Sequence, residues 1–213
     1  MNRVFILTGM HRSGTSLLAR FFENSGVRMG AEYLAIDERW KDTNPFGYFE
    51  DLAFVEFHKE LLARCNDTRD DVMWVKHLPT FTEADRKRAA ELVAVASGSG
   101  AAQAWGWKDP RTCFFLDLWA EILPDARFIF PYRDPDAVTD SLLKRHYLKR
   151  TSFRANREIY ELWLLHNELI LRFVERERSR CTVFSLERAL NDIPTFVERF
   201  SEATGYPFSD AVL

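Results

Sequence analysis

Hydrophobic residues along this chain follow two alternating patterns. Residues 4–7 are apolar throughout, which predicts a buried strand, and an apolar face over residues 17–22 then predicts a helix that ends near Gly26. Later apolar runs predict three further strands, at residues 104–107, 127–132 and 181–186. Strands that alternate with helices predict a three-layer α/β fold whose central sheet is mainly parallel.

Helical patterns occupy much of the remaining chain. They predict helices at residues 51–64, 82–96, 112–123, 156–177 and 193–204. Asp134 is expected to cap another helix, with Pro135 in its first turn. The Ser-Gly-Ser-Gly stretch at residues 97–100 is short and predicts a surface loop rather than a domain linker. We therefore expect one domain over residues 1–213, in which residues 27–100 are the least regular part.

Composition and charge narrow the class of protein. Of the 213 residues, 46% are hydrophobic and 29% are charged, which is typical of a soluble globular protein. The net charge of -3 argues against a nucleic-acid partner, because binding to a phosphate backbone needs a basic surface. No apolar run has the length of a membrane span or of a signal-peptide core. The three cysteines form no CxxC pair, which predicts a reducing compartment, the cytoplasm.

Residues 9–16, Gly-Met-His-Arg-Ser-Gly-Thr-Ser, have the frame of a phosphate-binding loop between a strand and a helix. Such a loop turns backbone N–H groups toward an anion, and the positive end of the helix adds to the attraction. A nucleoside triphosphatase would carry lysine after the second glycine, where this chain has Thr15, and the cation lies at Arg12 instead. No clear acidic strand end is present to hold magnesium. The pattern predicts an anion site without a metal, and a plain glycine turn is the alternative.

A second anion-binding pattern follows the strand predicted at residues 127–132. Arg133 stands at the carboxyl end of that strand, where ligands of open parallel sheets bind. Ser141 lies about two turns into the next helix. Either residue alone is more typical of an ordinary helix or surface position. Together with the loop, they predict a paired anion site.

These two motifs resemble those of the sulfotransferases that use 3′-phosphoadenosine 5′-phosphosulfate (PAPS). In that family a Gly-x-x-Arg/Lys-Ser-Gly-Thr-Thr/Ser loop binds the 5′-phosphosulfate, and an Arg with a Ser eight residues later binds the 3′-phosphate. The resemblance covers residues 3–26 and 104–205. It implies a P-loop-type fold with PAPS as the cofactor and no metal. It also implies a cofactor site made of His11, Arg12, Ser13, Gly14, Thr15, Ser16, Arg133 and Ser141.

Two further segments extend the resemblance. Residues 105–111, Trp-Gly-Trp-Lys-Asp-Pro-Arg, look like bacterial members that act on carbohydrates or other small acceptors, and Lys108 and Arg111 are the candidates for substrate binding there. Residues 184–190 resemble a common Tyr-Glu-x-Leu closing element, with Ser185 in place of the tyrosine. The implied activity is sulfuryl transfer to a hydroxyl or amine, with residues 27–100 holding the acceptor.

Sulfuryl transfer requires two kinds of help from the protein. Negative charge on the departing phosphate must be stabilised, for which Arg12 is the expected residue. A base must take the proton of the acceptor, and the candidates are Glu50, His77 and His11, although His11 is more typical of a residue that orients phosphate or substrate. Glu50 as a cap of the helix at residues 51–64 is the structural alternative.

Two functions of other classes remain open at this point. One is a P-loop kinase that uses a nucleoside triphosphate with magnesium, and the other is a nucleotide-binding module without catalysis. A kinase would need ATP and magnesium, whereas a binding module would bind the nucleotide without turnover. The sequence identifies neither the acceptor nor the oligomeric state.

Overall fold

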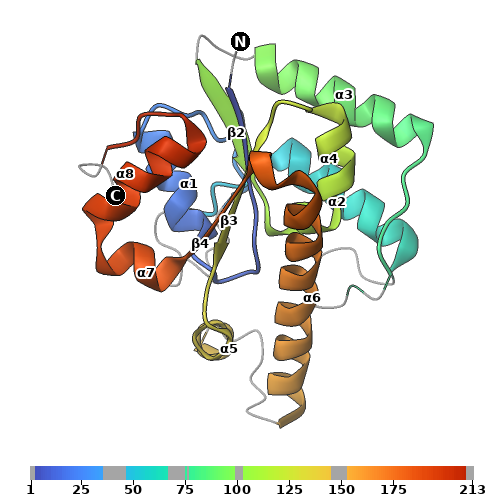
Figure 1. Ribbon diagram of the computed structural model, residues 1–213. Helices are drawn as coiled ribbons and strands as arrows, with labels where there is room; N and C mark the ends of the chain where they lie inside the picture. Colours follow the sequence, from blue (N-terminus) through green and yellow to red (C-terminus); the bar gives the residue numbers. More distant parts are fainter. Residues whose placement is uncertain are drawn as a thin grey trace.

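The computed structural model describes residues 3–35, 47–66, 75, 77–98, 103–144 and 153–209. Its centre is a parallel sheet of four strands in the order β2-β1-β3-β4 (Figure 1). The strands are β1 (Arg3–Leu7), β2 (Ala104–Lys108), β3 (Arg127–Tyr132) and β4 (Cys181–Ser185). The parallel sheet and its alternation with helices confirm the predicted α/β fold.

Helices cover both faces of this sheet (Figure 1). One face packs against α1 (Thr15–Asn24) and α8 (Ile193–Thr204), with the short α7 (Leu186–Asn191) beside them. On the other face lie α2 (Leu52–Cys65), α3 (Glu83–Gly98), α4 (Leu116–Ile122) and the long α6 (Phe153–Glu177). At the end of the sheet where β3 stops, α5 (Pro135–Lys144) begins.

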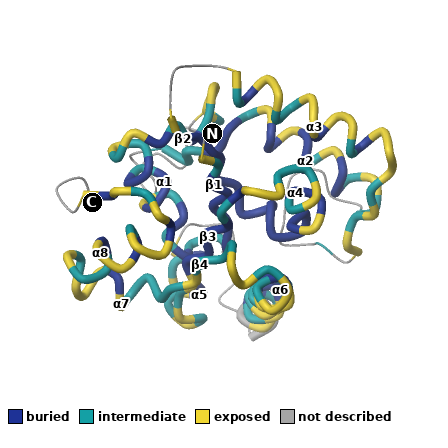
Figure 2. Tube along the Cα trace, turned by 45° about the horizontal axis from the view of Figure 1, so that its top comes forward, coloured by how far each residue is buried: buried dark blue, intermediate teal, exposed yellow. Residues whose placement is uncertain are grey.

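Side chains along β1 point alternately to the two faces of the sheet, and the core has one layer on each face. Phe5 and Leu7 pack toward α1 and α8, whereas Ile6 packs toward α2, α4 and α6. Both layers are rich in aromatic rings, as in the stacked pair of Phe54 and Trp107, whose centroids are 4.1 Å apart. Figure 2 shows that the buried residues run along the strands and the inward faces of the helices. The strands β1, β2 and β3 are mostly buried because both faces of the sheet are covered there.

The helix predicted at residues 112–123 begins differently from that prediction. The segment starts as a 3₁₀ helix, η3 (Pro110–Phe114), and becomes α-helical only in α4. The Asp109 side chain accepts a hydrogen bond from the backbone N–H of Arg111 at 3.0 Å and so caps η3. The cap fixes the start of the helical segment two residues earlier than its apolar pattern indicates.

Two other element ends were also predicted wrongly. Residues 97–98 continue α3, so the predicted loop does not begin there, and residues 99–100 lie outside the described part of the chain. The strand predicted to include Leu186 ends one residue earlier, because the Ser185 hydroxyl accepts a hydrogen bond from the Arg188 backbone N–H and starts α7.

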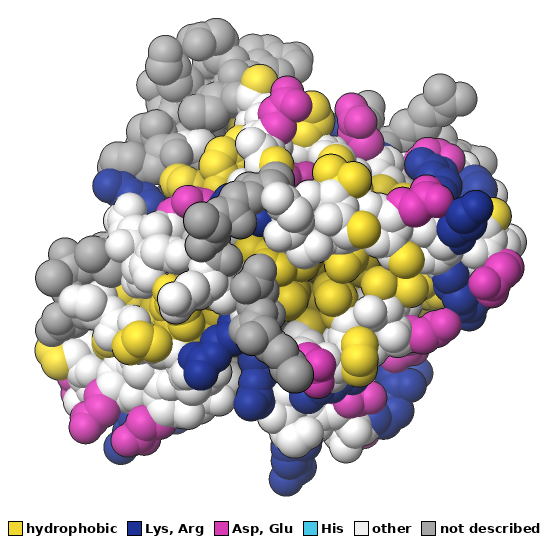
Figure 3. Space-filling view, turned by 90° about the horizontal axis from the view of Figure 1, so that it is seen from above, with side chains coloured by type: hydrophobic (Ala, Val, Ile, Leu, Met, Phe, Trp, Pro, Cys, Tyr) yellow, Lys and Arg dark blue, Asp and Glu magenta, His cyan; other side chains and the backbone are white. Residues whose placement is uncertain are grey.

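Charged side chains surround the end of the sheet at which β1 begins. Figure 3 looks onto this face and shows Lys and Arg side chains interspersed with Asp and Glu around a central group of hydrophobic ones. The phosphate-loop segment follows β1 and therefore lies at the opposite end of the sheet, beside the start of α5 (Figure 1). Among the described residues, no helix has the length and hydropathy needed to cross a membrane.

Candidate active site

The segment between β1 and α1 is a tight loop. At two of its positions, any residue larger than glycine would collide with neighbouring atoms. A Cβ on Gly9 would lie 2.8 Å from the carbonyl oxygen of Pro131, and a Cβ on Gly14 would lie 2.6 Å from the Leu186 side chain. Gly14 also has φ of 83°, which favours glycine. Arg12 adopts φ of 69° without being glycine. The loop is therefore held in a specific conformation by β3 and α7.

Several polar groups of this loop are left for an external partner. Gly14 is the N-cap of α1 and offers no side-chain cap, so the first-turn N–H groups lack that partner. Ser13 Oγ and His11 Nε2 are buried and have no hydrogen-bond partner among the described residues. Buried polar atoms are normally paired, and a phosphate or sulfate oxygen would supply what is missing. The residues present therefore fit an anionic group.

The second anion-binding pattern meets the loop in space. Arg12 Nε donates to Ser141 Oγ at 2.8 Å, and Arg133 Nη1 donates to the backbone carbonyl of Arg12 at 3.1 Å. Trp163 of α6 fixes the strand end by donating its Nε1–H to the Arg133 carbonyl at 3.0 Å. Arg133 Nε also lies 3.7 Å from Glu187 Oε1. The structure thus brings Arg12, Arg133 and Ser141 together, although Arg12 and Ser141 are 129 residues apart.

A buried cluster of charges lies on the other side of the loop, at the end of β2. Glu50 Oε1 is 2.7 Å from Lys108 Nζ, and its Oε2 is 3.3 Å from Arg111 Nη1. Arg111 Nη1 also lies 2.8 Å from Asp109 Oδ1. All four residues are at most 7% exposed. Two carboxylates and two cations therefore compensate one another, as burial of charge requires.

The protonation states of this cluster follow from its contacts. Burial alone would raise the pKa of Asp109, but the charge of Arg111 and the hydrogen bond from His58 outweigh burial and hold this pKa well below its usual range. Burial likewise lowers the pKa of Arg111, and the charges of Asp109 and Glu50 outweigh it and raise the pKa above its usual range. Both residues are therefore charged at neutral pH.

Backbone contacts connect the charge cluster with the loop. The Tyr48 carbonyl accepts hydrogen bonds from Lys108 Nζ at 2.9 Å and from the Ser16 hydroxyl at 3.4 Å. Thr8, the first residue after β1, donates its hydroxyl to the Asp109 carbonyl at 2.8 Å. Lys108 and Glu50, both predicted to be site residues, therefore lie beside the first turn of α1.

Glu50 does not serve as the cap of α2, which was its structural alternative. The N-cap is Asp51, whose side chain accepts from the backbone N–H groups of Ala53 and Phe54 at 3.0 and 3.3 Å. Glu50 is turned instead toward Lys108 and Arg111, which lie at and just beyond the end of β2. The ion pairs of Glu50 with Lys108 and Arg111 therefore account for its position, and capping of α2 does not.

His77 lies far from this cluster. Its backbone N–H donates at 3.0 Å to Oδ1 of Asn66, the residue that directly follows the end of α2. Glu50 lies just before the start of the same helix. Because α2 has 14 residues, the two ends are separated by about 20 Å. The His77 side chain is exposed. Of the two, the structure brings only Glu50 to the loop.

His11 stays in the loop and contacts a second histidine. Burial lowers the pKa of His11 well below its usual value, and the positive charge of Arg111 lowers it further. The His11 and His166 rings meet edge to face with centroids 6.5 Å apart. Burial lowers the pKa of His166 to about 4, and its Nδ1–H donates to the Leu162 carbonyl at 2.9 Å, since that oxygen only accepts. Both imidazoles are neutral at pH 7.

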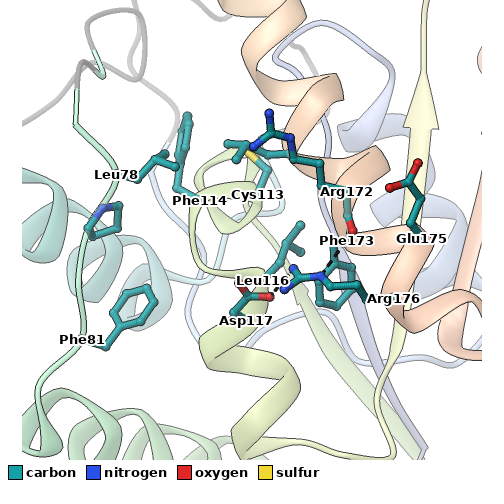
Figure 4. Close-up of a pocket in the computed structure, with 12 residues that line it drawn as sticks. Leu78, Phe81, Cys113, Phe114, Leu116, Asp117, Arg172, Phe173, Glu175 and Arg176 are labelled. Carbon is teal, nitrogen blue, oxygen red and sulfur yellow. Dashed lines mark hydrogen bonds and ion pairs between the residues drawn. The ribbon is translucent and has the colours of Figure 1, made fainter.

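A groove of about 500 Å³ lies between α6, η3 and the segment Leu78–Phe81 (Figure 4). Its lining includes the apolar residues Phe81, Leu116 and Phe173 and the charged residues Arg172 and Arg176. Arg172 and Arg176 pair with Glu168 and Asp117. None of the residues predicted to bind cofactor, bind substrate or take part in catalysis lines this groove.

Sequence reasoning missed Asp109 and His58. His58 is fully buried in α2, and its Nδ1 lies 2.7 Å from Asp109 Oδ2. Asp109 stands between the predicted residues Lys108 and Arg111, so its place next to the site was visible in the sequence. His58 had no such signal, because its position in an otherwise ordinary helix is 51 residues from Asp109. Among the described residues, no group of three or more His, Cys, Asp or Glu residues is arranged to hold a metal.

A glycine loop after the first strand, a helix N-terminus beyond it and an arginine at a neighbouring strand end are features of an α/β protein of the P-loop type, and together they form a candidate anion site. The family model described as "Sulfotransferase family" matches residues 4–210, and the chain belongs to this family. It is therefore a transferase that moves a sulfuryl group to an acceptor. A comparison with curated proteins found no match.

Solved structures of the same fold agree with this family. The chain is similar to "Sulfotransferase Domain from the Curacin Biosynthetic Pathway", with 15% identity, a TM-score of 0.62 and coverage of 100% of this chain and 76% of that one. A sulfotransferase domain from the Synechococcus PCC 7002 olefin synthase gives 19% identity, a TM-score of 0.61 and the same coverage. A sulfotransferase from Alicyclobacillus acidocaldarius gives 14% identity, a TM-score of 0.56 and coverage of 100% and 86%. The family match does not support the alternative of a kinase.

Proposed function

We propose that this sulfotransferase takes its sulfuryl group from PAPS and passes it to a hydroxyl or amine of a small acceptor, with a carbohydrate as one candidate. The observation that carries the proposal is the contact between the two anion-binding motifs, in which Arg12 Nε donates to Ser141 Oγ and Arg133 donates to the Arg12 carbonyl. A donor with a 5′-phosphosulfate and a 3′-phosphate would use both motifs at once. PAPS supplies the activated sulfuryl group on a phosphate that then departs.

Each motif has a separate task in this proposal. The loop from His11 to Ser16 holds the 5′-phosphosulfate through its backbone N–H groups, the orphaned Ser13 hydroxyl and the N-terminus of α1. Arg12 stabilises the charge that develops on the departing phosphate. Arg133 and Ser141 bind the 3′-phosphate. No residue in this set needs a metal ion to bind the anion.

The charge cluster at the end of β2 is assigned to the acceptor side of the reaction. Glu50 takes the acceptor proton on a carboxylate oxygen, and Lys108 and Arg111 hold Glu50 and the acceptor in place. We prefer Glu50 over His77 because of the separation of about 20 Å along α2. We prefer it over His11 because His11 belongs to the loop, where its unpaired Nε2 is buried.

We further propose one domain over residues 1–213, which acts in the cytoplasm, where its free cysteines stay reduced.

Nucleotide binding tests the choice of donor. Adenosine 3′,5′-bisphosphate, the product of PAPS, should raise the melting temperature without added metal. At about 100 times its dissociation constant, ligand linkage predicts a gain of about 2.7 kcal/mol in the free energy of unfolding. The measurement is a thermal-shift titration in the presence of EDTA, with ATP and magnesium as the comparison. Stabilisation by ATP with magnesium alone would overturn the proposal in favour of a kinase.

Replacing Arg133 by alanine should separate the two phosphate sites. The variant should bind adenosine 3′,5′-bisphosphate more weakly by about 1.5–3 kcal/mol, because a charge-assisted contact to the 3′-phosphate is lost. Binding of adenosine 5′-phosphate, which lacks that group, should change little. Isothermal titration calorimetry gives both affinities. Arg86→Ala, which removes a surface arginine paired with Glu121, is the matched control. Equal losses for both nucleotides would contradict a role for Arg133 in recognising the 3′-phosphate.

A further inference from the structure

The imidazole ring of His58 is completely buried. His58 lies in α2 with no exposed surface, and its ring stacks on Phe115 with centroids 4.4 Å apart and planes 20° from parallel. Its Nδ1 is 2.7 Å from Asp109 Oδ2, and its Nε2 is 2.9 Å from Trp119 Nε1. Both nitrogens of the imidazole are therefore engaged, and the ring orientation is fixed by stacking and by two hydrogen bonds.

The two partners decide which nitrogen of His58 carries the proton. The indole N–H of Trp119 can only donate, so His58 Nε2 must be unprotonated and accept. The proton is then on Nδ1 and is donated to the Asp109 carboxylate. Burial favours this neutral form, because it lowers the pKa of His58 more than Asp109 raises it. Trp119 thus holds His58 as a donor toward Asp109.

Asp109 divides its carboxylate between His58 and Arg111. Oδ2 accepts from His58, which leaves Oδ1 for Arg111 Nη1 at 2.8 Å and for the Arg111 backbone N–H at 3.0 Å. The same Arg111 Nη1 reaches Glu50 Oε2 at 3.3 Å. A continuous chain of contacts therefore runs from Trp119 and His58 in the core, through Asp109 and Arg111, to Glu50 beside the loop.

We propose that His58 is a positioning residue for sulfuryl transfer, which orients Asp109 so that Arg111 and Glu50 are held in the geometry the reaction needs. The inference rests on the proposed function, because it assigns the acceptor side of the reaction to Glu50 and Arg111. Without the His58 hydrogen bond, the Asp109 carboxylate can rotate, and the Arg111 guanidinium then loses one of the contacts that fix it. His58 itself touches neither donor nor acceptor.

Two amide variants separate the two hydrogen bonds of His58. In His58→Asn the amide nitrogen is bonded to Cγ, as Nδ1 is, so the variant can donate to Asp109 but loses the contact with Trp119. In His58→Gln the amide extends to the position of Nε2, so the variant can accept from Trp119 but loses the contact with Asp109. Because both substitutions replace the same buried ring by a polar amide, a purely structural role predicts similar effects of both.

The positioning role predicts a clear difference between them. Release of adenosine 3′,5′-bisphosphate from PAPS, measured with the small-molecule fraction of a cell extract as the acceptor mixture, should fall by about tenfold to a hundredfold in His58→Gln, because misplaced groups cost rate. His58→Asn should stay close to the wild type. The dissociation constant of adenosine 3′,5′-bisphosphate should be unchanged in both variants. Phe57→Leu, which perturbs α2 next to His58, is the control and should lower the melting temperature with no selective loss of turnover.

Nuclear magnetic resonance of the wild-type protein adds a readout that does not depend on activity. With nitrogen-15 in its five histidines, the His58 signals are those that disappear in His58→Asn. They should show a protonated Nδ1 and an unprotonated Nε2. An Nε2–H tautomer, or equal turnover of His58→Gln and wild type, would overturn the inference while leaving the proposed function in place. A wild-type protein that neither binds the bisphosphate nor consumes PAPS would instead overturn the proposed function and the inference with it.

Discussion

Replacing Glu50 by glutamine is expected to lower turnover about a hundredfold or more, since removal of a general base typically costs 10²–10⁴ in rate. Glutamine has nearly the same shape but cannot take a proton from the acceptor. Steady-state release of adenosine 3′,5′-bisphosphate from PAPS measures this loss.

Stability must be measured beside turnover, because Glu50 also balances buried charge. The glutamine amide oxygen can still accept from Lys108 Nζ, but the negative charge that faces Lys108 and Arg111 is lost, so the variant should lose about 3 kcal/mol of unfolding free energy in urea. Asp85→Asn, which breaks the half-buried pair with Arg64, provides a control with a stability loss away from the loop. A folded Glu50→Gln protein with wild-type turnover would exclude Glu50 as the base.

The sheet and most helices were predictable because their sequence signals are local. The strands β1 to β3 are short, mostly apolar runs, and their burial by helices on both faces accounts for that composition, whereas the edge strand β4 is only partly buried. Asp134 caps α5 as predicted, accepting from the backbone N–H of Asp136 at 2.9 Å. At two of the boundaries that were predicted wrongly, a polar cap sets the start of the element against the apolar pattern: Asp109 for η3 and Ser185 for α7.

The anion motifs were predictable for the same reason, whereas the contacts within the charge cluster were not. A phosphate loop needs its glycines and its arginine within eight residues, so a single sequence displays them. Glu50 and Lys108 are 58 residues apart; each was predicted to be a site residue, but their contact with one another was not predicted. His58 and Asp109 are 51 residues apart and are joined only because α2 packs beside η3. Sequence spacing carries no record of such contacts.

Replacing Arg12 by alanine is expected to lower turnover about a hundredfold, because loss of one donor that stabilises developing charge costs 10²–10³ in kcat. The affinity for adenosine 3′,5′-bisphosphate should fall less, since the loop N–H groups, Arg133 and Ser141 still hold the two phosphates. Arg12→Lys should recover part of the rate because it restores the charge, although it cannot reproduce the Nε–H contact with Ser141 Oγ.

The contact between Arg12 and Ser141 makes a further comparison decisive. Ser141→Ala removes the 2.8 Å hydrogen bond that orients Arg12 but leaves its charge in place. If Arg12 acts on the departing phosphate from this orientation, Ser141→Ala should lower both affinity and kcat, whereas Arg12→Ala should lower mainly kcat. Arg20→Ala, in the middle of α1, is the control for a lost arginine. An Arg12→Ala protein with weakened binding and unchanged kcat would reduce Arg12 to a residue that docks the nucleotide, because an interaction equal in ground and transition states does not raise the chemical rate.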